Sequence, residues 1–166
     1  MHAECVTQQG DGSTTMAPHS PGCMGCGPDN PAGLNMTIRR DGDEVVTDVV
    51  FDRRQAGAPG LAHGGAVAAA CDDLFGFVLY LARTPGVTKT LQVEYFSPVP
   101  LGEPQTIRGR LVERDGRKLH MTGEGTAPDG TVRFTATALF LSVLRSHFEA
   151  FGRFEDHPGL RRLEGD

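Results

Sequence analysis

The chain has 166 residues, the length of one ordinary domain, which is enough to bury a sizeable core without disulfides or metal ions. Its 16 Lys and Arg residues against 21 Asp and Glu give a net charge of −5, and no basic run is longer than two residues. Binding to a nucleic-acid backbone needs clustered cations, so no nucleic-acid partner is expected. No uninterrupted apolar stretch reaches the ~20 residues of a membrane span, so no membrane is expected either.

The two ends of the chain differ in composition from its middle. Residues 1–22 are rich in Gly, Ser, Thr, Gln and Pro, and we expect a disordered leader here. They lack a basic start followed by an apolar block, so no signal peptide is expected and a cytoplasmic location is the default. The predicted domain covers residues 23–144. In the tail, residues 145–166, a short helix could dock on this domain through Phe148, Phe151 and Phe154.

The middle of the chain predicts strands on both sides of one helix. Residues 34–38 and 46–49 alternate apolar and polar side chains around Asp41-Gly42-Asp43, which predicts a β-hairpin. Residues 63–82 are dense in Ala and Leu and contain no Pro, which predicts a helix. The later links are too short for parallel crossovers, so we expect an antiparallel sheet. Its remaining strands are predicted at residues 88–96, 105–113, 118–126 and 131–144.

The predicted helix is apolar nearly all round. Val67, Cys71, Leu74 and Val78 form one stripe, while Phe77 and several alanines cover other sides. Such a helix must be buried on most of its faces. A curved antiparallel sheet of about six strands wrapped around one central helix meets this requirement, so the expected fold class is α+β.

Two acidic residues, Asp72 and Asp73, interrupt this apolar helix. A buried carboxylate without a partner is costly, so the pair needs a reason. Both could face solvent at a gap in the wrapping, or one could act in catalysis. Measured from the centre of the apolar stripe, the two point about equally far away on opposite sides. Helical geometry alone therefore does not choose between them.

The helix begins with His63-Gly64-Gly65. Glycines at a helix start leave the unpaired N–H groups uncovered, and the helix dipole adds positive potential there. A carbonyl oxygen or an anion could bind these groups, as in an oxyanion hole. The alternative is a simple turn into the helix that needs Gly for its backbone angles.

The spacing of these groups bears on where a site could form. His63 and Asp72 are nine residues apart, so on one helix they lie ~13 Å apart along the axis and ~180° apart around it. They cannot meet as a pair within one chain. If both act on one substrate, the Asp must come from a second copy whose helix runs antiparallel to the first, which predicts an active site between subunits.

The motif from Gly57 to Val67 (GAPGLAHGGAV), followed by Asp72, resembles the hot-dog-fold acyl-CoA thioesterases. It looks in particular like the branch that holds the phenylacetyl-CoA thioesterases and the thioesterase-superfamily-member enzymes of mitochondria. Residues 88–100 and 23–34 also look like this family, so the likeness covers about residues 23–144. The resemblance implies the hot-dog fold.

The resemblance also implies catalytic roles. The main-chain N–H of Gly64, beside His63, would polarise the thioester carbonyl. Asp72 matches the family's catalytic carboxylate, which acts as a nucleophile or as a general base on water. Thr88 matches a Ser or Thr that helps to hold this carboxylate or the water.

Other residues are expected to bind the substrate. Gly65 belongs to the same glycine turn. Some relatives carry an Asn six positions before the His, where this chain has Gly57, and Gln55 is the candidate substitute. A basic group at a predicted hairpin tip is either an ordinary solvated turn or a clamp for the coenzyme A phosphates, formed by Arg114, Arg117 and Lys118.

The expected substrate is an acyl-CoA or acyl-carrier-protein thioester, and the expected assembly is a homodimer or a homotetramer built as a dimer of dimers. The implied hydrolysis needs no metal or redox cofactor, since coenzyme A enters as part of the substrate. Two alternatives remain open: a hydratase or dehydratase that acts on acyl thioesters, and a module that binds acyl-CoA without turning it over.

Cys23 and Cys26, with His19 nearby, raise the question of a zinc site. Structural zinc has four ligands, and the sequence offers no second Cys pair and no His pair. The preferred interpretation is therefore two small apolar residues in a segment that enters the domain, and no metal is expected.

Overall fold

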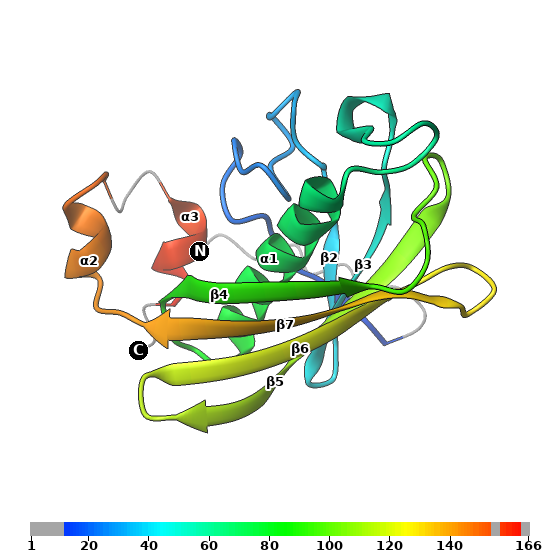
Figure 1. Cartoon of the computed structure of the whole chain (residues 1–166). Helices are drawn as coiled ribbons and strands as arrows, with labels where there is room; N and C mark the ends of the chain where they lie inside the picture. Colours follow the sequence, from blue (N-terminus) through cyan, green and yellow to red (C-terminus); the bar gives the residue numbers. More distant parts are fainter. Residues whose placement is uncertain (1–11, 154–156, 164–166) are drawn as a thin grey trace.

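The computed structural model describes residues 12–153 and 157–163. One antiparallel sheet curves around the long helix α1, Gly64–Leu81 (Figure 1). The strands lie in the order β1-β2-β3-β5-β6-β7-β4. They are β1 Thr14–Thr15, β2 Ile38–Asp41, β3 Glu44–Val50, β4 Gly86–Tyr95, β5 Pro104–Asp115, β6 Lys118–Thr126 and β7 Val132–Ser142. A short 3-10 turn, η1 at Arg53–Gln55, precedes α1.

The predicted α+β class and the curved antiparallel sheet around one helix are confirmed. The described residues contain seven strands where about six were expected. The additional strand, β1, pairs with β2 and lies in the stretch interpreted as a disordered leader. The structure places residues 12–22 in the fold, whereas residues 1–11 lie outside the described part.

The first hairpin is shifted relative to its prediction. The alternating stretch at residues 34–38 is not a strand, because β2 begins only at Ile38. Two backbone N–H groups of this stretch bond instead to the preceding segment: Leu34 donates to the Met24 carbonyl at 2.8 Å and Met36 to the Gly25 carbonyl at 2.9 Å. Residues 34–37 therefore hold the N-terminal segment in place and do not extend the sheet.

Helix α1 forms the centre of the core. Its buried side chains are Val67, Ala70, Cys71, Leu74, Phe75, Phe77, Val78 and Leu79. By length and composition alone α1 could cross a membrane, but its residues pack here against the strands β3, β4, β5 and β7, as in the core helix of a globular domain.

Two glycines that face each other across β5 and β6 make room for α1. Gly109 and Gly123 are cross-strand partners, and a Cβ added at either one would lie within 3.4 Å of the Phe75 ring. The absence of side chains at these two positions therefore lets the helix lie close to the sheet.

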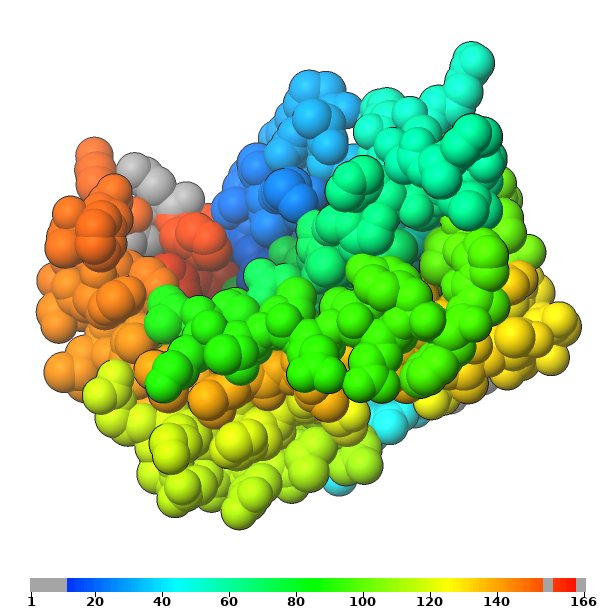
Figure 2. Space-filling view, in the orientation of Figure 1, coloured from blue at the N-terminus to red at the C-terminus, as the bar shows by residue number. Residues whose placement is uncertain are grey.

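Strand β4 forms one edge of the sheet, next to β7. Figure 2 shows β4 (green) across the near face, with the N-terminal segment (blue) and the loop before α1 (teal) above it. Two large side chains at the end of this edge are strongly exposed: Tyr95 at 48% and Phe96 at 62%. An unpaired strand edge with exposed aromatic side chains is a surface on which a second chain can pair.

The tail forms two short helices, α2 at Ser146–Glu149 and α3 at Pro158–Arg161. Helix α3 docks on the N-terminal segment, since the Gly159 N–H donates to the His19 carbonyl at 2.9 Å and Arg162 donates to the Ala17 carbonyl at 2.8 Å. Among the three phenylalanines expected to dock, Phe148 is half-buried, Phe151 is 85% exposed, and Phe154 lies outside the described residues.

The glycine pair yields a stability prediction. In Gly123→Ala the new Cβ would lie 2.6 Å from the Arg108 carbonyl oxygen, a backbone atom that cannot move aside. We expect this variant to lose about 1–3 kcal/mol of unfolding free energy, as in overpacked cores. Gly109→Ala is the matched control, because its Cβ would meet the flexible end of Leu74 at 3.2 Å. Urea unfolding measures both, and equal losses would contradict this explanation.

Candidate active site

His63 caps the start of α1. Its backbone is extended, with φ −65° and ψ 134°, and its Nδ1 accepts a hydrogen bond from the Gly65 N–H at 2.8 Å. Among the described residues the Gly64 N–H has no hydrogen-bond partner. The cap therefore uses the Gly65 amide and leaves the Gly64 amide as the donor at the positive end of the helix dipole.

Tyr95, at the end of β4, contacts this turn. No functional role was predicted for it from the sequence. Its hydroxyl donates to the Gly64 carbonyl oxygen. Burial raises the pKa of Tyr95, so the phenol keeps the proton that it donates. A pocket of about 390 Å³ adjoins this turn, lined by Gly64, Tyr95 and apolar residues that include Val67 and Val99. Tyr95 belongs to the family-like stretch at residues 88–100, which was the sequence signal for it.

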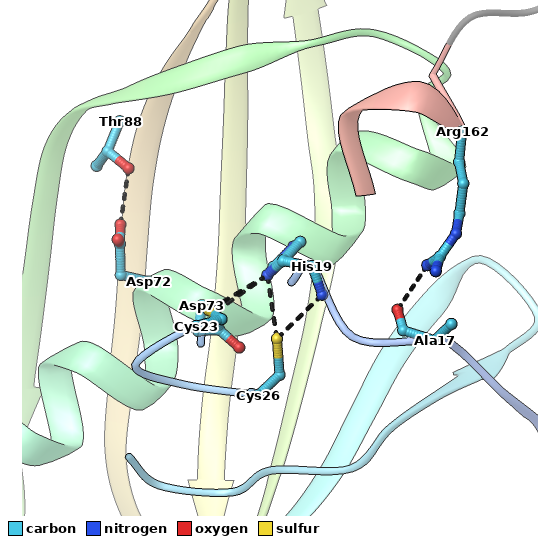
Figure 3. A network of polar contacts seen from close by, with 8 residues as sticks. All are labelled: Ala17, His19, Cys23, Cys26, Asp72, Asp73, Thr88 and Arg162. Atoms are coloured by element: carbon cyan, nitrogen blue, oxygen red, sulfur yellow. Dashed lines mark hydrogen bonds and ion pairs between the residues drawn. The ribbon is translucent and has the colours of Figure 1, made fainter. Parts of the chain in front are cut away.

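Asp72 lies further along α1 and faces β4. Its Oδ1 accepts a hydrogen bond from the Thr88 hydroxyl at 2.8 Å (Figure 3). The carboxylate is half-buried and lines a pocket of about 350 Å³. Most other lining residues are apolar and come from α1, β4, β7 and the tail, among them Leu79, Val87 and Phe140, and the polar ones include His19 of the N-terminal segment and Asp73. The structure thus brings together the predicted carboxylate and the predicted hydroxyl.

The thiol next to Asp72 is unsuited to nucleophilic chemistry. Burial, with a smaller effect of the neighbouring Asp72 charge, raises the pKa of Cys71 to about 12. The thiolate is the reactive form of cysteine, and at neutral pH it would be scarce here. A carboxylate, not a thiolate, is therefore the reactive group that this part of α1 offers.

Within one chain the glycine turn and the carboxylate are apart. Gly64 lines the pocket near Tyr95, whereas Asp72 lines the pocket near Thr88, eight residues and ~12 Å along the helix. The structure thus keeps the Gly64 turn and the Asp72 carboxylate of one chain apart, as helix geometry predicts for the helix start and Asp72.

Asp73 points to the other side of α1, toward the N-terminal segment (Figure 3). Its Oδ1 lies 3.1 Å from His19 Nδ1 and 3.1 Å from Cys23 Sγ. Cys26 Sγ lies 3.3 Å from the same His19 nitrogen. Burial lowers the pKa of His19, but its hydrogen bonds with Asp73 and Cys23 outweigh burial and raise it to about 9. The two acids of α1 therefore have separate hydrogen-bond partners, although both line the pocket of about 350 Å³.

The remaining predicted residues lie at two places. Gln55 accepts from the Asp52 N–H through its side-chain oxygen and from the His63 N–H through its main-chain oxygen, so it supports the turn before α1. The basic group sits at the exposed tip between β5 and β6, where its members make local contacts: Arg114 to Gly116, Arg117 to Ser142 and Lys118 to Asp115.

The chain is similar to known proteins in both sequence and structure. A sequence profile of the thioesterase superfamily matches residues 59–134. The crystal structure of a thioesterase superfamily protein is similar with a TM-score of 0.67 and 30% identity, over 84% of this chain and 70% of that one. A hypothetical thioesterase protein of Streptococcus pneumoniae, solved with coenzyme A, is similar with a TM-score of 0.62 and 25% identity, over 66% of this chain and 86% of that one.

Curated relatives match over part of their length. Acyl-coenzyme A thioesterase THEM4 of Xenopus laevis is 32% identical over 88 residues, which are 52% of this chain and 40% of that protein. The chain thus spans less than half of the curated relatives that it matches. The Streptococcus thioesterase has also been solved with Ala in place of an Asp in one variant and of a Thr sixteen positions later in another.

The role of His63 as a cap can be tested by unfolding. We expect His63→Ala to lower the unfolding free energy by about 0.5–2 kcal/mol, because the Gly65 N–H loses its acceptor. His63→Asn should restore most of this loss, because Asn accepts the same bond in the same backbone conformation. Urea denaturation at neutral pH measures both variants. Equal stability of the Ala and Asn variants would contradict the capping role.

Proposed function

Because the chain belongs to the thioesterase superfamily, we propose that it hydrolyses an acyl-CoA thioester to a free acid and a thiol. The single observation that carries this proposal is the pair formed by Asp72 and Thr88 at an apolar pocket. A thioester carbonyl is already electrophilic, so hydrolysis needs a positioned water or carboxylate and a donor for the oxyanion. The chain offers both groups.

In this proposal Asp72 is the catalytic carboxylate. It activates the attacking water as a general base or attacks the carbonyl carbon itself, and the Thr88 hydroxyl fixes its orientation. The Asp and Thr replaced in the Streptococcus thioesterase have the same separation, sixteen positions, as Asp72 and Thr88, which supports this assignment. Asp73 is unsuited to the role because His19 and Cys23 already contact its carboxylate.

The oxyanion donor comes from a second copy of the chain. As the water adds, the negative charge that develops on the carbonyl oxygen is stabilised by the Gly64 N–H of one subunit and the dipole of its α1. The carboxylate of the other subunit lies on the opposite side of the ester, and the coenzyme A thiolate leaves. The exposed edge of β4 and the small residues Gly64, Gly65, Ala68 and Ala69 on the half-covered face of α1 give the second helix room to approach.

The basic tip remains the candidate site for the coenzyme A phosphates. The hydrogen bond from Arg117 to the Ser142 carbonyl places it beside the start of β4, because Gly86 pairs with Ser142. This is the end of the strand that carries Thr88. Release of free thiol from a panel of acyl-CoA and acyl-carrier-protein thioesters tests the proposal: binding without release would favour a binding module, and water addition without release a hydratase.

The assignment of Asp72 predicts a large loss of turnover. Asp72→Asn should lower kcat by about 10²-fold or more, the usual contribution of a positioned base. Thr88→Ala should lower it by about tenfold or more, because the charged carboxylate loses one hydrogen bond, while Thr88→Ser should keep most activity. Asp43→Asn, in an exposed turn, is the control. Wild-type thiol release by Asp72→Asn would overturn the assignment.

The shared site predicts complementation between two inactive variants. Gly64→Pro removes the proposed N–H donor, and Pro is accepted at the first position of a helix after the extended His63. It also adds a Cβ, which would lie 3.3 Å from the Tyr95 hydroxyl oxygen. Gly64→Ala keeps the donor and is the matched control. Each dimer of Asp72→Asn with Gly64→Pro would contain one intact site, so an equal mixture should recover about a quarter of wild-type activity.

A mixture that stays inactive after verified subunit exchange would place the whole site within one chain. Gel filtration of the wild-type protein as a monomer would also contradict the shared site.

A further inference from the structure

Four side chains of metal-ligating types converge where the N-terminal segment packs on α1 (Figure 3). They are His19, Cys23 and Cys26 from the N-terminal segment and Asp73 from the helix. One ligand atom from each lies within 4.8 Å of those of the other three. Zinc is not expected from the sequence because only two cysteines and one His lie close together in it, and the fourth group, Asp73, comes 47 positions after Cys26.

The distances between these atoms fit one small cation at their centre. Zinc bonds of about 2.3 Å to sulfur and about 2.0 Å to nitrogen and oxygen place tetrahedral ligands about 3.3–3.8 Å apart. His19 Nδ1 lies 3.1 Å from Asp73 Oδ1, 3.3 Å from Cys26 Sγ and 3.9 Å from Cys23 Sγ. Cys23 Sγ lies 3.1 Å from Asp73 Oδ1.

Hydrogen bonding alone accounts poorly for this cluster. His19 Nδ1 carries either one proton or one lone pair, yet three side-chain atoms surround it within 3.9 Å. The Asp73 side chain is only 9% exposed, and its Oδ2 is buried with no hydrogen-bond partner in the described part of the chain. A cation would give both the crowded nitrogen and the buried carboxylate a partner.

The surroundings hold the ligands in these positions. The His19 ring lies 4.0 Å from the Phe77 ring, and its backbone N–H donates to Cys26 Sγ at 3.3 Å. Two glycines allow the close approach of the segment to the helix. A Cβ at Gly25 would lie 2.2 Å from the Asp73 carboxyl carbon, and one at Gly76 would lie 2.9 Å from the His19 ring.

We propose that His19, Cys23, Cys26 and Asp73 bind one Zn²⁺ ion in a closed tetrahedral site. Two thiolates and an imidazole are ligands that zinc prefers over Mg²⁺ or Ca²⁺, and four protein ligands leave no position for a catalytic water. The ion is therefore structural. It fastens the N-terminal segment to α1, and with it α3, which bonds to the His19 carbonyl. This inference does not rest on the proposed hydrolase activity.

Metal analysis of the purified full-length chain tests the site. We expect about one zinc per chain by mass spectrometry, released when a mercurial reagent blocks the thiols. Cys23→Ala and Asp73→Asn should each lose most of this zinc. Cys71→Ala is the matched control, because Cys71 is buried in the same helix and outside the cluster. Zinc content that Cys23→Ala leaves unchanged would overturn the proposal.

Cobalt substitution of the wild-type chain gives a readout that does not depend on whether the variants fold. After zinc removal, added Co²⁺ should produce the thiolate-to-cobalt band and the intense visible bands of tetrahedral cobalt. Zinc removal should also lower Tm by about 5 °C or more, since the ion binds only the folded chain. A zinc-free chain as purified, with no such bands and an unchanged Tm, would mean that the cluster is a buried ion pair with two free thiols.

Discussion

The organisation of this protein depends on two consecutive carboxylates in a helix that is otherwise apolar. Neighbouring residues on an α-helix point about 100° apart, and Asp72 and Asp73 bond to different partners here. Each is compensated by a different part of the fold, because a buried charge without a partner is costly. Asp72 accepts a hydrogen bond from Thr88 of β4, and the Asp73 carboxylate contacts His19 of the N-terminal segment. The two carboxylates thereby contact different elements of the fold.

The elements that the sequence predicts well are those encoded by local signals. Helix α1 differs from its prediction by one residue at each end, and the Asp-Gly pairs at 115–116 and 129–130 mark the turns between β5, β6 and β7. The N-terminal segment was misread because its order comes from distant contacts. Its composition is typical of a flexible leader, but β1 pairs with β2 and His19 contacts a residue 54 positions away. No hydrophobic periodicity within residues 12–36 indicates which distant residues this segment contacts.

In the candidate site, too, the features set by local sequence can be predicted and those set by distant contacts cannot. The separation of Gly64 from Asp72 follows from helix geometry, and it could be predicted without a structure. The choice between Asp72 and Asp73 could not, because the two lie symmetrically about the apolar stripe and their partners come from other elements. Likewise, the His63 side chain was expected near the oxyanion donor, but its bond to the Gly65 N–H appears only when the turn is built. This bond occupies the Gly65 N–H and leaves the Gly64 N–H available for a ligand.

The contacts of Asp73 also constrain Asp72. Apolar packing around α1 is broad, with buried side chains on most of its faces, and the hydrophobic effect that drives it is not directional. Directional polar contacts tolerate much less rotation of a helix about its axis. The contacts of Asp73 with His19 and Cys23 restrain the rotation of α1 on one side, and the bond between Asp72 and Thr88 restrains it on another. Because Asp72 and Asp73 are consecutive in one helix, a rotation of α1 that breaks one set of contacts also displaces the other.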